Sequence, residues 1–219
     1  MDQATLQARL DAGYAQVALR QGQQVTAYRP DPTQPTVAAL DPRHIYSAPL
    51  AFFNADPNFA LVKPVQADKP QIYVAIDRTL LQQGDYLVDV DSNTWFIGSL
   101  APVMATAAMR CNRVFTLQRP VPATGAFAYG GNAPADLSTL LTSWPGFISS
   151  KTRGVSPEER VPGDTKLYLT QIYLPVTQGF YVVPNDILID DSPDPARYTV
   201  ALATETGWGW EIDCYYAGA

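Results

Sequence analysis

The clearest hydrophobic pattern lies at the start of the chain. Four apolar residues recur there at intervals of four, four and three positions, which is one stripe of a helix with 3.6 residues per turn: Leu6, Leu10, Tyr14 and Val17. Asp2 is suited to cap the start of this helix and Gly22 to end it. The pattern predicts an amphipathic helix over residues 2–21, within an N-terminal segment 1–22. Its apolar stripe has to be buried against the chain's own β-structure or against a neighbouring subunit.

Beyond the helix, the pattern changes to short apolar runs that are typical of strands. These runs cover residues 25–29, 71–76, 84–89, 94–97 and 110–119. The third and fourth runs flank the polar sequence Asp91-Ser92-Asn93, which predicts a β-hairpin. Prolines interrupt the region 30–65, so we expect an ordered, extended loop with short strands there.

A second series of apolar runs near the C-terminus follows the same plan. It covers residues 166–173, 185–190, 197–202 and 210–216. Residues 185–190 resemble residues 84–89, and the Asp-Ser pair that follows is the same in both places. Cys111 follows Trp95 by sixteen residues, and Cys214 follows Tyr198 by the same interval. These correspondences indicate a degenerate internal repeat; the alternative is that any two hairpins with acidic turns look alike.

We therefore predict a mainly β fold of β-barrel or sandwich units, with one N-terminal helix and long Pro-rich loops. The expected divisions are the helix (1–22), a first β-unit with Pro-rich loops (23–120), a long inserted loop region (121–163) and a second β-unit packed with the first (164–219). The inserted region includes a short predicted helix over residues 136–141 and an exposed sequence around Trp144 and Phe147. A region of this length usually binds a partner, although it could also pack across its own barrel.

The composition narrows the classes of function. Charged residues make up 16% of the chain, against about 25% in ordinary domains, which favours a surface that is partly covered by association. The net charge is −6, which argues against a groove that binds nucleic acid, because such a groove neutralises phosphates with Lys and Arg. The sequence contains no apolar run of membrane-spanning length, and the acidic N-terminal segment is unlike a signal or transit peptide, so we expect no membrane partner.

Residues that carry catalysis are sparse. His44 is the single histidine, and the sequence Gly-x-Ser-x-Gly does not occur. Cys111 and Cys214 make neither a disulfide framework nor a metal motif. We therefore expect no catalytic residue, no metal and no cofactor, and a protein that is not an enzyme.

Two further features allow a binding function. Acidic residues gather in the turns near Asp89 and Asp190, where they could bind Ca²⁺, but Asp is also favoured in turns for its hydrogen bonds to the backbone. Their recurrence in both hairpins favours shared turn geometry. Trp208 and Trp210 could stack on a sugar, although alternating aromatic residues more often lie in the core on one face and in an interface on the other.

The predicted hairpin at residues 84–97 resembles the β-units of tailed-phage neck proteins, which include head-completion, stopper and adaptor proteins. These commonly carry a Gly-Asp-x-hydrophobic sequence, a short turn and an aromatic-plus-aliphatic strand, as in Gly84-Asp85-Tyr86-Leu87 followed by Thr94-Trp95-Phe96-Ile97. The segment 185–202 is similar. The resemblance covers residues 70–120 and 165–216. Most small stoppers have one such unit, whereas this chain has two and a long insertion.

The resemblance implies a structural virion protein of the phage neck or collar. Copies would form a closed homo-oligomeric ring, a hexamer or dodecamer, between the portal or adaptor protein and the tail terminator or tail tube. DNA would pass through the ring without specific binding, and assembly would take place in the cytoplasm of the bacterial host. We expect eight residues to contribute to subunit contacts: Leu6, Leu10, Tyr14, Val17, Trp144, Phe147, Trp208 and Trp210.

The alternatives are other functions of a β-rich protein. One is another tail structural protein, such as a tail terminator or baseplate protein. The other is a carbohydrate- or calcium-binding β-module, which predicts a monomer that sugar or calcium stabilises.

Overall fold

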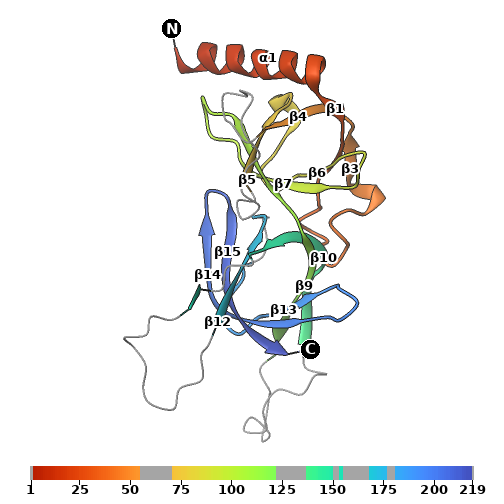
Figure 1. Ribbon diagram of the computed structural model, residues 1–219, viewed down its shortest axis with the longest axis vertical. Coiled ribbons are helices and arrows are strands. Elements are labelled where there is room, and N and C mark those ends of the chain that lie inside the picture. The colour runs from red at the N-terminus through yellow and green to blue at the C-terminus, as the bar shows by residue number, and fades with distance from the viewer. Residues whose placement is uncertain are drawn as a thin grey trace, which may run out of the picture.

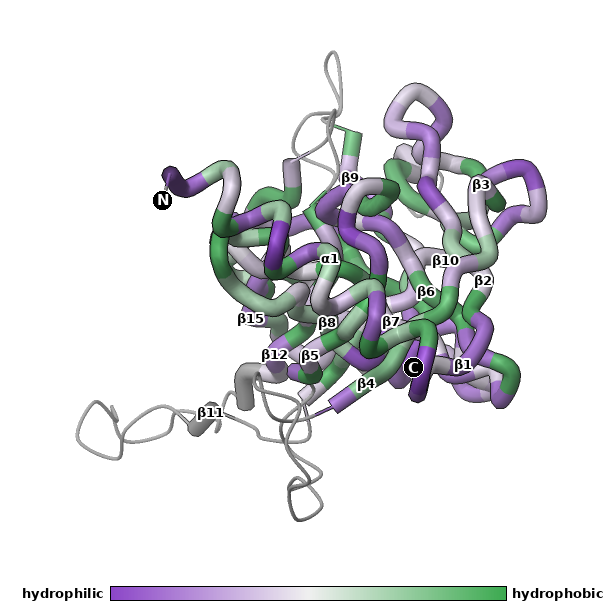
Figure 2. The backbone as a smooth tube through the Cα atoms, turned by 90° about the horizontal axis from the view of Figure 1, so that it is seen from above, coloured by the Kyte–Doolittle hydropathy of each residue, from purple (hydrophilic) through white to green (hydrophobic). Residues whose placement is uncertain are grey.

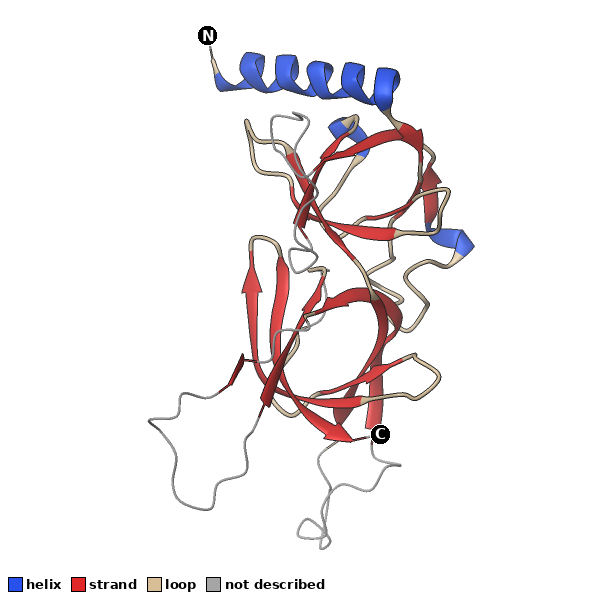
Figure 3. Ribbon diagram, viewed as in Figure 1, coloured by secondary structure: helices blue, strands red, loops and turns tan. Residues whose placement is uncertain are grey.

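The computed structural model describes residues 2–54, 71–121, 137–149, 153–154, 168–176 and 181–218. It confirms a mainly β fold with one N-terminal helix, followed by two rounded sheets stacked along the long axis (Figures 1 and 3). The first sheet curls into an open half-barrel, and the second closes into a barrel of six strands. We call them the first unit and the second unit.

The first unit contains eight strands in the order β1-β4-β5-β8-β7-β6-β2-β3. Their bounds are β1 (Gln23–Gln24), β2 (Thr26–Tyr28), β3 (Ile45–Ser47), β4 (Leu50–Asn54), β5 (Gln71–Ala75), β6 (Tyr86–Val88), β7 (Thr94–Ser99) and β8 (Thr106–Arg110). Two short 3-10 helices, η1 (Pro42–His44) and η2 (Arg78–Leu80), lie in its connections.

The two edges of this sheet belong to one bent hairpin. β1 leads into β2 through Val25, and β3 leads into β4 through two residues. β1 pairs with β4 and β2 pairs with β3, and across the bend the Val25 N–H donates to the Pro49 carbonyl at 3.0 Å. The two edges of the open sheet therefore approach each other at this bend, where the second unit has continuous strands.

The second unit follows after only two residues. Its strands are β9 (Arg113–Pro120), β10 (Leu137–Ile148), β11 (Arg153–Gly154), β12 (Tyr168–Leu174), β13 (Ile187–Asp190), β14 (Arg197–Thr206) and β15 (Gly209–Gly218). Their order is β10-β9-β13-β14-β15-β12-β11, and pairing of β10 with β12 closes the barrel.

The two units have the same topology. Each strand or strand pair of the first unit has a counterpart in the second, in chain order. β1/β2 corresponds to β9, β3/β4 to β10, β5 to β12, β6 to β13, β7 to β14 and β8 to β15. Neighbouring strands pair in the same cyclic order in both units, and each pairing gives the same residue correspondence. The register shift between Ile97 and Ser99 recurs between Val200 and Leu202. Chance similarity of two hairpins does not extend around a whole sheet, so the repeat alternative is the one that the structure supports.

The repeat extends to the hydrophobic interior. Ten buried residues form the core of the first unit: Val25, Ala27, Ala51, Val74, Ile76, Leu81, Leu87, Trp95, Ile97 and Ala108. The strand registers match them to ten buried residues of the second unit: Phe115, Leu117, Gly146, Ile172, Leu174, Val182, Leu188, Tyr198, Val200 and Cys214. At some matched positions one unit has a large side chain where the other has a small one, but every position is buried in both units.

An apolar joint connects the units. Successive residues of a strand face opposite sides of a sheet, so β6, β7 and β8 also present outward-facing side chains. Three of these, Tyr86, Phe96 and Met109, are buried in the same hydrophobic cluster as the core of the second unit. Tyr86 lies edge-on to Trp144, with ring centroids 6.2 Å apart, and its hydroxyl donates to the Pro145 carbonyl at 2.8 Å. The joint is therefore packed like a protein interior.

The helix α1 (Gln3–Gln21) covers the opposite end of the first unit (Figure 1). The Asp2 side chain caps it by accepting from the Thr5 N–H at 2.9 Å, and Gly22 ends it, as predicted. A Cβ on Gly22 would lie 3.1 Å from the Ala51 backbone, so glycine permits this close approach. Hydrophilic and hydrophobic segments alternate along α1 (Figure 2). Of the predicted stripe, Leu6 is exposed and the other three residues are half-buried against the first unit.

Arg78 fastens α1 to the first unit. Its guanidinium donates to the carbonyls of Leu100, Ala101 and Met104 in the β7–β8 turn, and it lies 3.8 Å from the Asp11 carboxylate of α1. The Val103 N–H of the same turn donates to the Gln7 side chain. The β7–β8 turn and α1 therefore form one end of the molecule.

The boundary expected at residue 120 differs from the structure. The predicted strand 110–119 is broken at Cys111 and Asn112, and β9 pairs with β10 and β13 in the second unit. The predicted helix at 136–141 is wrong, because residues 137–148 form β10; Leu137, Leu140 and Leu141 have helical spacing, but pairing with β9 decides their conformation. Most of the inserted loop 121–163 outside β10 and β11 lies outside the described residues.

The match of Cys111 to Cys214 is also wrong. Cys214 pairs with Val200, whose counterpart Ile97 pairs with Ala108. The equal spacing arose because the β14–β15 hairpin is three residues longer than the β7–β8 hairpin, and this shifts Cys214 away from the position of Cys111.

Trp144→Ala tests whether the two units share a core. Because Trp144 is 1% exposed and packs on Tyr86, its loss leaves a cavity in the joint, and we expect the free energy of unfolding to fall by about 3–5 kcal/mol. Urea denaturation followed by circular dichroism measures it. Val90→Ala, at a turn residue that is 72% exposed, is the control and should change stability by less than about 0.5 kcal/mol. If Trp144→Ala lowers the free energy of unfolding as little as Val90→Ala does, the joint adds little stability.

Candidate functional site

A buried carboxylate fixes the end of the first unit that faces the second. Asp85 is 1% exposed and accepts two hydrogen bonds from Arg29, at 2.8 and 2.7 Å, in a bidentate pair. The Gln82 N–H and the Tyr46 hydroxyl donate to it at 2.8 and 2.7 Å. Arg29 also donates to the Leu80 carbonyl at 2.7 Å. Together these bonds satisfy the buried charge, and they tie β2 to the connection before β6.

The second unit contains the same arrangement. Asp186 is 1% exposed and accepts from Arg119 at 2.8 Å through each of its oxygens, and from the Val183 N–H at 2.9 Å. Arg119 also donates to the Tyr181 carbonyl at 2.6 Å. The residue before each aspartate, Gly84 or Asn185, has a positive φ, of 89° and 72° respectively. We call these two arrangements the clamps.

Sequence reasoning missed the clamps, because each Arg–Asp pair joins residues 56 or 67 positions apart. One feature of the sequence is common to both clamps and could have indicated them: each arginine precedes a proline, in Arg29-Pro30 and Arg119-Pro120.

The clamps are structural ion pairs. Hydrogen bonding to Asp85 raises the pKa of Arg29, and hydrogen bonding to Asp186 raises the pKa of Arg119. Burial raises the pKa of Tyr46, and its hydrogen bond to Asp85 raises it further. All three groups therefore stay protonated at neutral pH and act as hydrogen-bond donors.

The acidic turns use their carboxylates in the same way. Asp89 accepts from the N–H groups of Asp91 and Asn93 at 3.0 and 2.7 Å, and from the Gln23 side chain at 3.3 Å. In the second unit, Asp190 accepts from the Ser192 N–H at 2.7 Å, and Arg113 lies 3.2 Å from its other oxygen. These contacts agree with the turn interpretation. Within the described part of the chain, no group of three or more His, Cys, Asp or Glu residues could hold a metal.

The two thiols lie in apolar surroundings. The Cys111 residue is partly exposed, but burial of its sulfur raises the thiol pKa. Burial also raises the pKa of Cys214, to about 12, with a smaller contribution from Asp213. His44 contacts the Ala39 carbonyl at 3.2 Å through a ring nitrogen.

The aromatic residues expected at subunit contacts lie mostly inside the chain. Trp144 was expected to be exposed and is buried in the joint; Trp210 is 5% exposed and lies in the core beside Tyr181. Trp208 lies at the β14–β15 turn, where a Cβ on Gly98 of the first unit would approach its ring to 3.0 Å. Phe147 is half-buried, with its ring centroid 6.2 Å from that of Tyr173. The rings of Trp144 and Trp210 therefore make their contacts within the chain.

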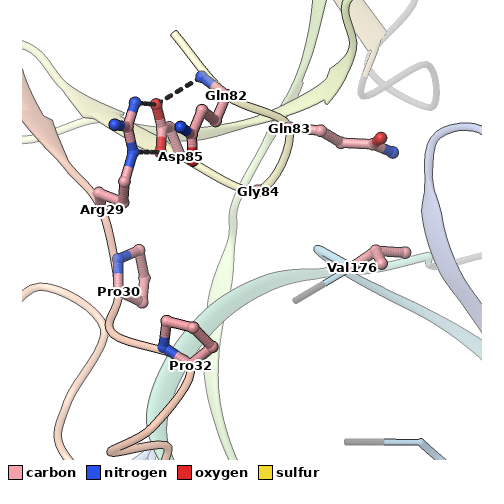
Figure 4. A pocket seen from close by; sticks show the side chains of 8 residues that line it. All are labelled: Arg29, Pro30, Pro32, Gln82, Gln83, Gly84, Asp85 and Val176. Atoms are coloured by element: carbon pink, nitrogen blue, oxygen red, sulfur yellow. Dashed lines mark hydrogen bonds and ion pairs between the residues drawn. The ribbon is translucent and has the colours of Figure 1, made fainter. Parts of the chain in front are cut away.

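A cavity of about 270 Å³ lies beside the first clamp, between the two units (Figure 4). It is lined by Arg29, Pro30, Pro32, Gln82, Gln83, Gly84, Asp85 and Val176. The polar head groups of its wall, Arg29 and Asp85, point toward each other and are bonded together (Figure 4). The charged groups of the cavity wall are therefore already paired with each other.

Exposed apolar side chains identify the surfaces that can bind a partner. One group lies on α1 and the β7–β8 turn, which we call the helix-capped end: Leu6, Leu19, Val103 and Met104, with exposed fractions of 39, 64, 37 and 59%. Others lie on the second unit, including Tyr181, Tyr215 and Tyr216. The first group lies at the end of the molecule that α1 covers (Figure 1) and the second on the other unit, and we take both groups as the candidate site.

No protein-family model, curated protein or solved structure matches this chain. No helix in the described ranges is long and apolar enough to cross a membrane.

Removing a clamp arginine should destabilise the fold. Arg119→Met leaves Asp186 buried without its charged partner, and we expect a loss of about 2 kcal/mol in the free energy of unfolding, less than for a fully buried pair because the Arg119 side chain is 37% exposed. Arg43→Met is the matched control, since Arg43 pairs with Asp41 at the surface and should contribute under about 0.5 kcal/mol. Equal losses in urea denaturation would show that the clamp is unimportant for stability.

Both cysteines should be unreactive in the folded protein. At pH 8 the raised pKa values keep the thiols protonated, and the thiolate is the reactive form. We expect Ellman's reagent to label neither thiol within minutes under native conditions, and to label both in urea. Rapid labelling of Cys111 in the native protein would contradict its assigned burial.

Proposed function

We propose that this protein is a structural subunit of a tailed-phage neck or collar, which assembles into a closed ring of identical copies between the head and the tail. The observation that carries the proposal is the exposure of apolar side chains on both units of a molecule whose units share a buried hydrophobic cluster. Tyr215 and Tyr216 are 37 and 59% exposed in the second unit, and Met104 is 59% exposed at the helix-capped end. Exposed apolar groups of this kind mark surfaces that associate.

The joint supports a mechanical role. The two units share a buried hydrophobic cluster, and the clamps fix the connections at the end of each unit. A subunit that has to transmit force between head and tail needs such rigid connections, whereas a hinge between the units would let the ring deform.

The charge of the chain supports a passive channel. With a net charge of −6, the protein repels the DNA backbone, so DNA would pass through the ring without specific binding. In this role the neighbours are the portal or adaptor protein on the head side and the tail terminator or tail tube on the other. The chain would then reside in the neck of the virion, after assembly in the bacterial cytoplasm.

A calcium- or sugar-binding module has less support. The carboxylates of Asp89 and Asp190 already accept hydrogen bonds from their own turns, and the ring of Trp210 is buried.

Light scattering coupled to gel filtration tests the proposal. We expect the purified protein to have a mass that is a multiple of 23.9 kDa corresponding to a hexamer or dodecamer, unchanged by calcium. Negative-stain images of that fraction should show closed rings. A monomer at all concentrations, with a melting temperature that rises on addition of calcium, would contradict the ring and favour the binding module.

A further inference from the structure

In the joint, the outer surface of β6, β7 and β8 of the first unit forms an interface with the second unit. Tyr86, Phe96 and Met109 are register neighbours on β6, β7 and β8, and they form a row across the outer surface of the first unit. This row is buried: its three residues are 0, 0 and 6% exposed. It packs on the second unit, where Tyr86 meets Trp144 and Phe96 lies close to Gly209.

The second unit carries a matching row that is less buried. The register matches Tyr86, Phe96 and Met109 to Ile187, Thr199 and Tyr215, which are neighbours on β13, β14 and β15. We call these three residues the outer row. Ile187 and Thr199 are half-buried, and Tyr215 is 37% exposed. A surface that is fully buried as an interface in the first unit is therefore only partly buried in the second.

The surface that receives the row in the joint also has a counterpart. In the second unit it is formed by the bend of β10 at Trp144 and Pro145 and by the β14–β15 turn. The corresponding parts of the first unit are the start of β4 and the β7–β8 turn. α1 packs on β4, so the helix-capped end occupies the position at which the next unit would dock.

The helix-capped end has the properties of a contact surface. Its apolar side chains are exposed, and Val103 at the tip of the β7–β8 turn has a φ of 60°. This conformation is strained for a β-branched residue, and strain of this kind concentrates at functional positions.

We propose that the outer row of one copy docks on the helix-capped end of a second copy, so that the chain assembles head to tail. The inference rests on the proposed function, because a closed ring of identical subunits needs one contact between two different surfaces, repeated around the ring. The contact uses the same outer surface of the unit that forms the joint within a chain, and a rotation between successive copies closes the ring.

Two variants, each with one surface blocked, test the proposal. Tyr215→Arg places a charge in the outer row, and the double variant Leu6→Arg/Met104→Arg places charges on the helix-capped end. Each variant alone should be a monomer of 23.9 kDa in light scattering, because each lacks one of the two surfaces. Val90→Arg, which changes an exposed turn residue outside both surfaces, should assemble like the natural protein. A single melting transition near that of the natural protein establishes that each variant is folded.

The decisive step is to mix the two blocked variants. Each keeps the surface that the other has lost, so an equimolar mixture should form a 1:1 complex of about twice 23.9 kDa and no larger species. If the outer row instead docks on itself, the helix-end variant will dimerise alone and the mixture will add nothing. That result overturns the head-to-tail contact.

Failure of this inference is distinct from failure of the proposed function. A natural protein that forms rings, with Tyr215→Arg still forming them, would overturn the inference and leave the ring intact. A natural protein that is monomeric at all concentrations would overturn both. Ile187→Arg is a second probe of the outer row, and it should give the same result as Tyr215→Arg.

Discussion

The packing of Tyr86, Phe96 and Met109 against the second unit is the interaction on which the rest of the structure depends. Alternation along β6, β7 and β8 directs one set of side chains into the first unit and the next set into the joint. The same three strands therefore build a core and an interface at once. As a result, the two units form a continuous body around a shared hydrophobic cluster.

The clamps show how the repeat preserves its frame while its surfaces diverge. Both keep a buried aspartate, a bidentate arginine and a backbone N–H donor, because a buried carboxylate that loses its partners is costly. The outer residues are less constrained: Phe96 of the joint corresponds to Thr199, and Tyr46, which donates to Asp85, corresponds to Leu140. The interior pattern that the two units share holds the strand registers, and their outer surfaces make different contacts.

Local patterns were enough to predict the helix with its caps, the main hairpins and the repeat. Contacts between distant residues were not predictable in this way. The break between β8 and β9 is only two residues long, Cys111 and Asn112, so the sequence pattern predicts one strand although the chain crosses between the units there. β10 resembles a helix in its leucine spacing, and only pairing with β9 makes it a strand. The sequence around Trp144 is predicted to be exposed, yet Tyr86 of the first unit packs on Trp144 and Trp144 is buried.

A single-particle reconstruction of the assembled protein tests the central claim most directly. Our account predicts a closed ring in which Tyr215 of each copy contacts the turn containing Met104 of the next copy. The same map should show Trp144 buried in the joint of every subunit. A ring in which the outer row faces solvent, with copies joined through other surfaces, would contradict the account.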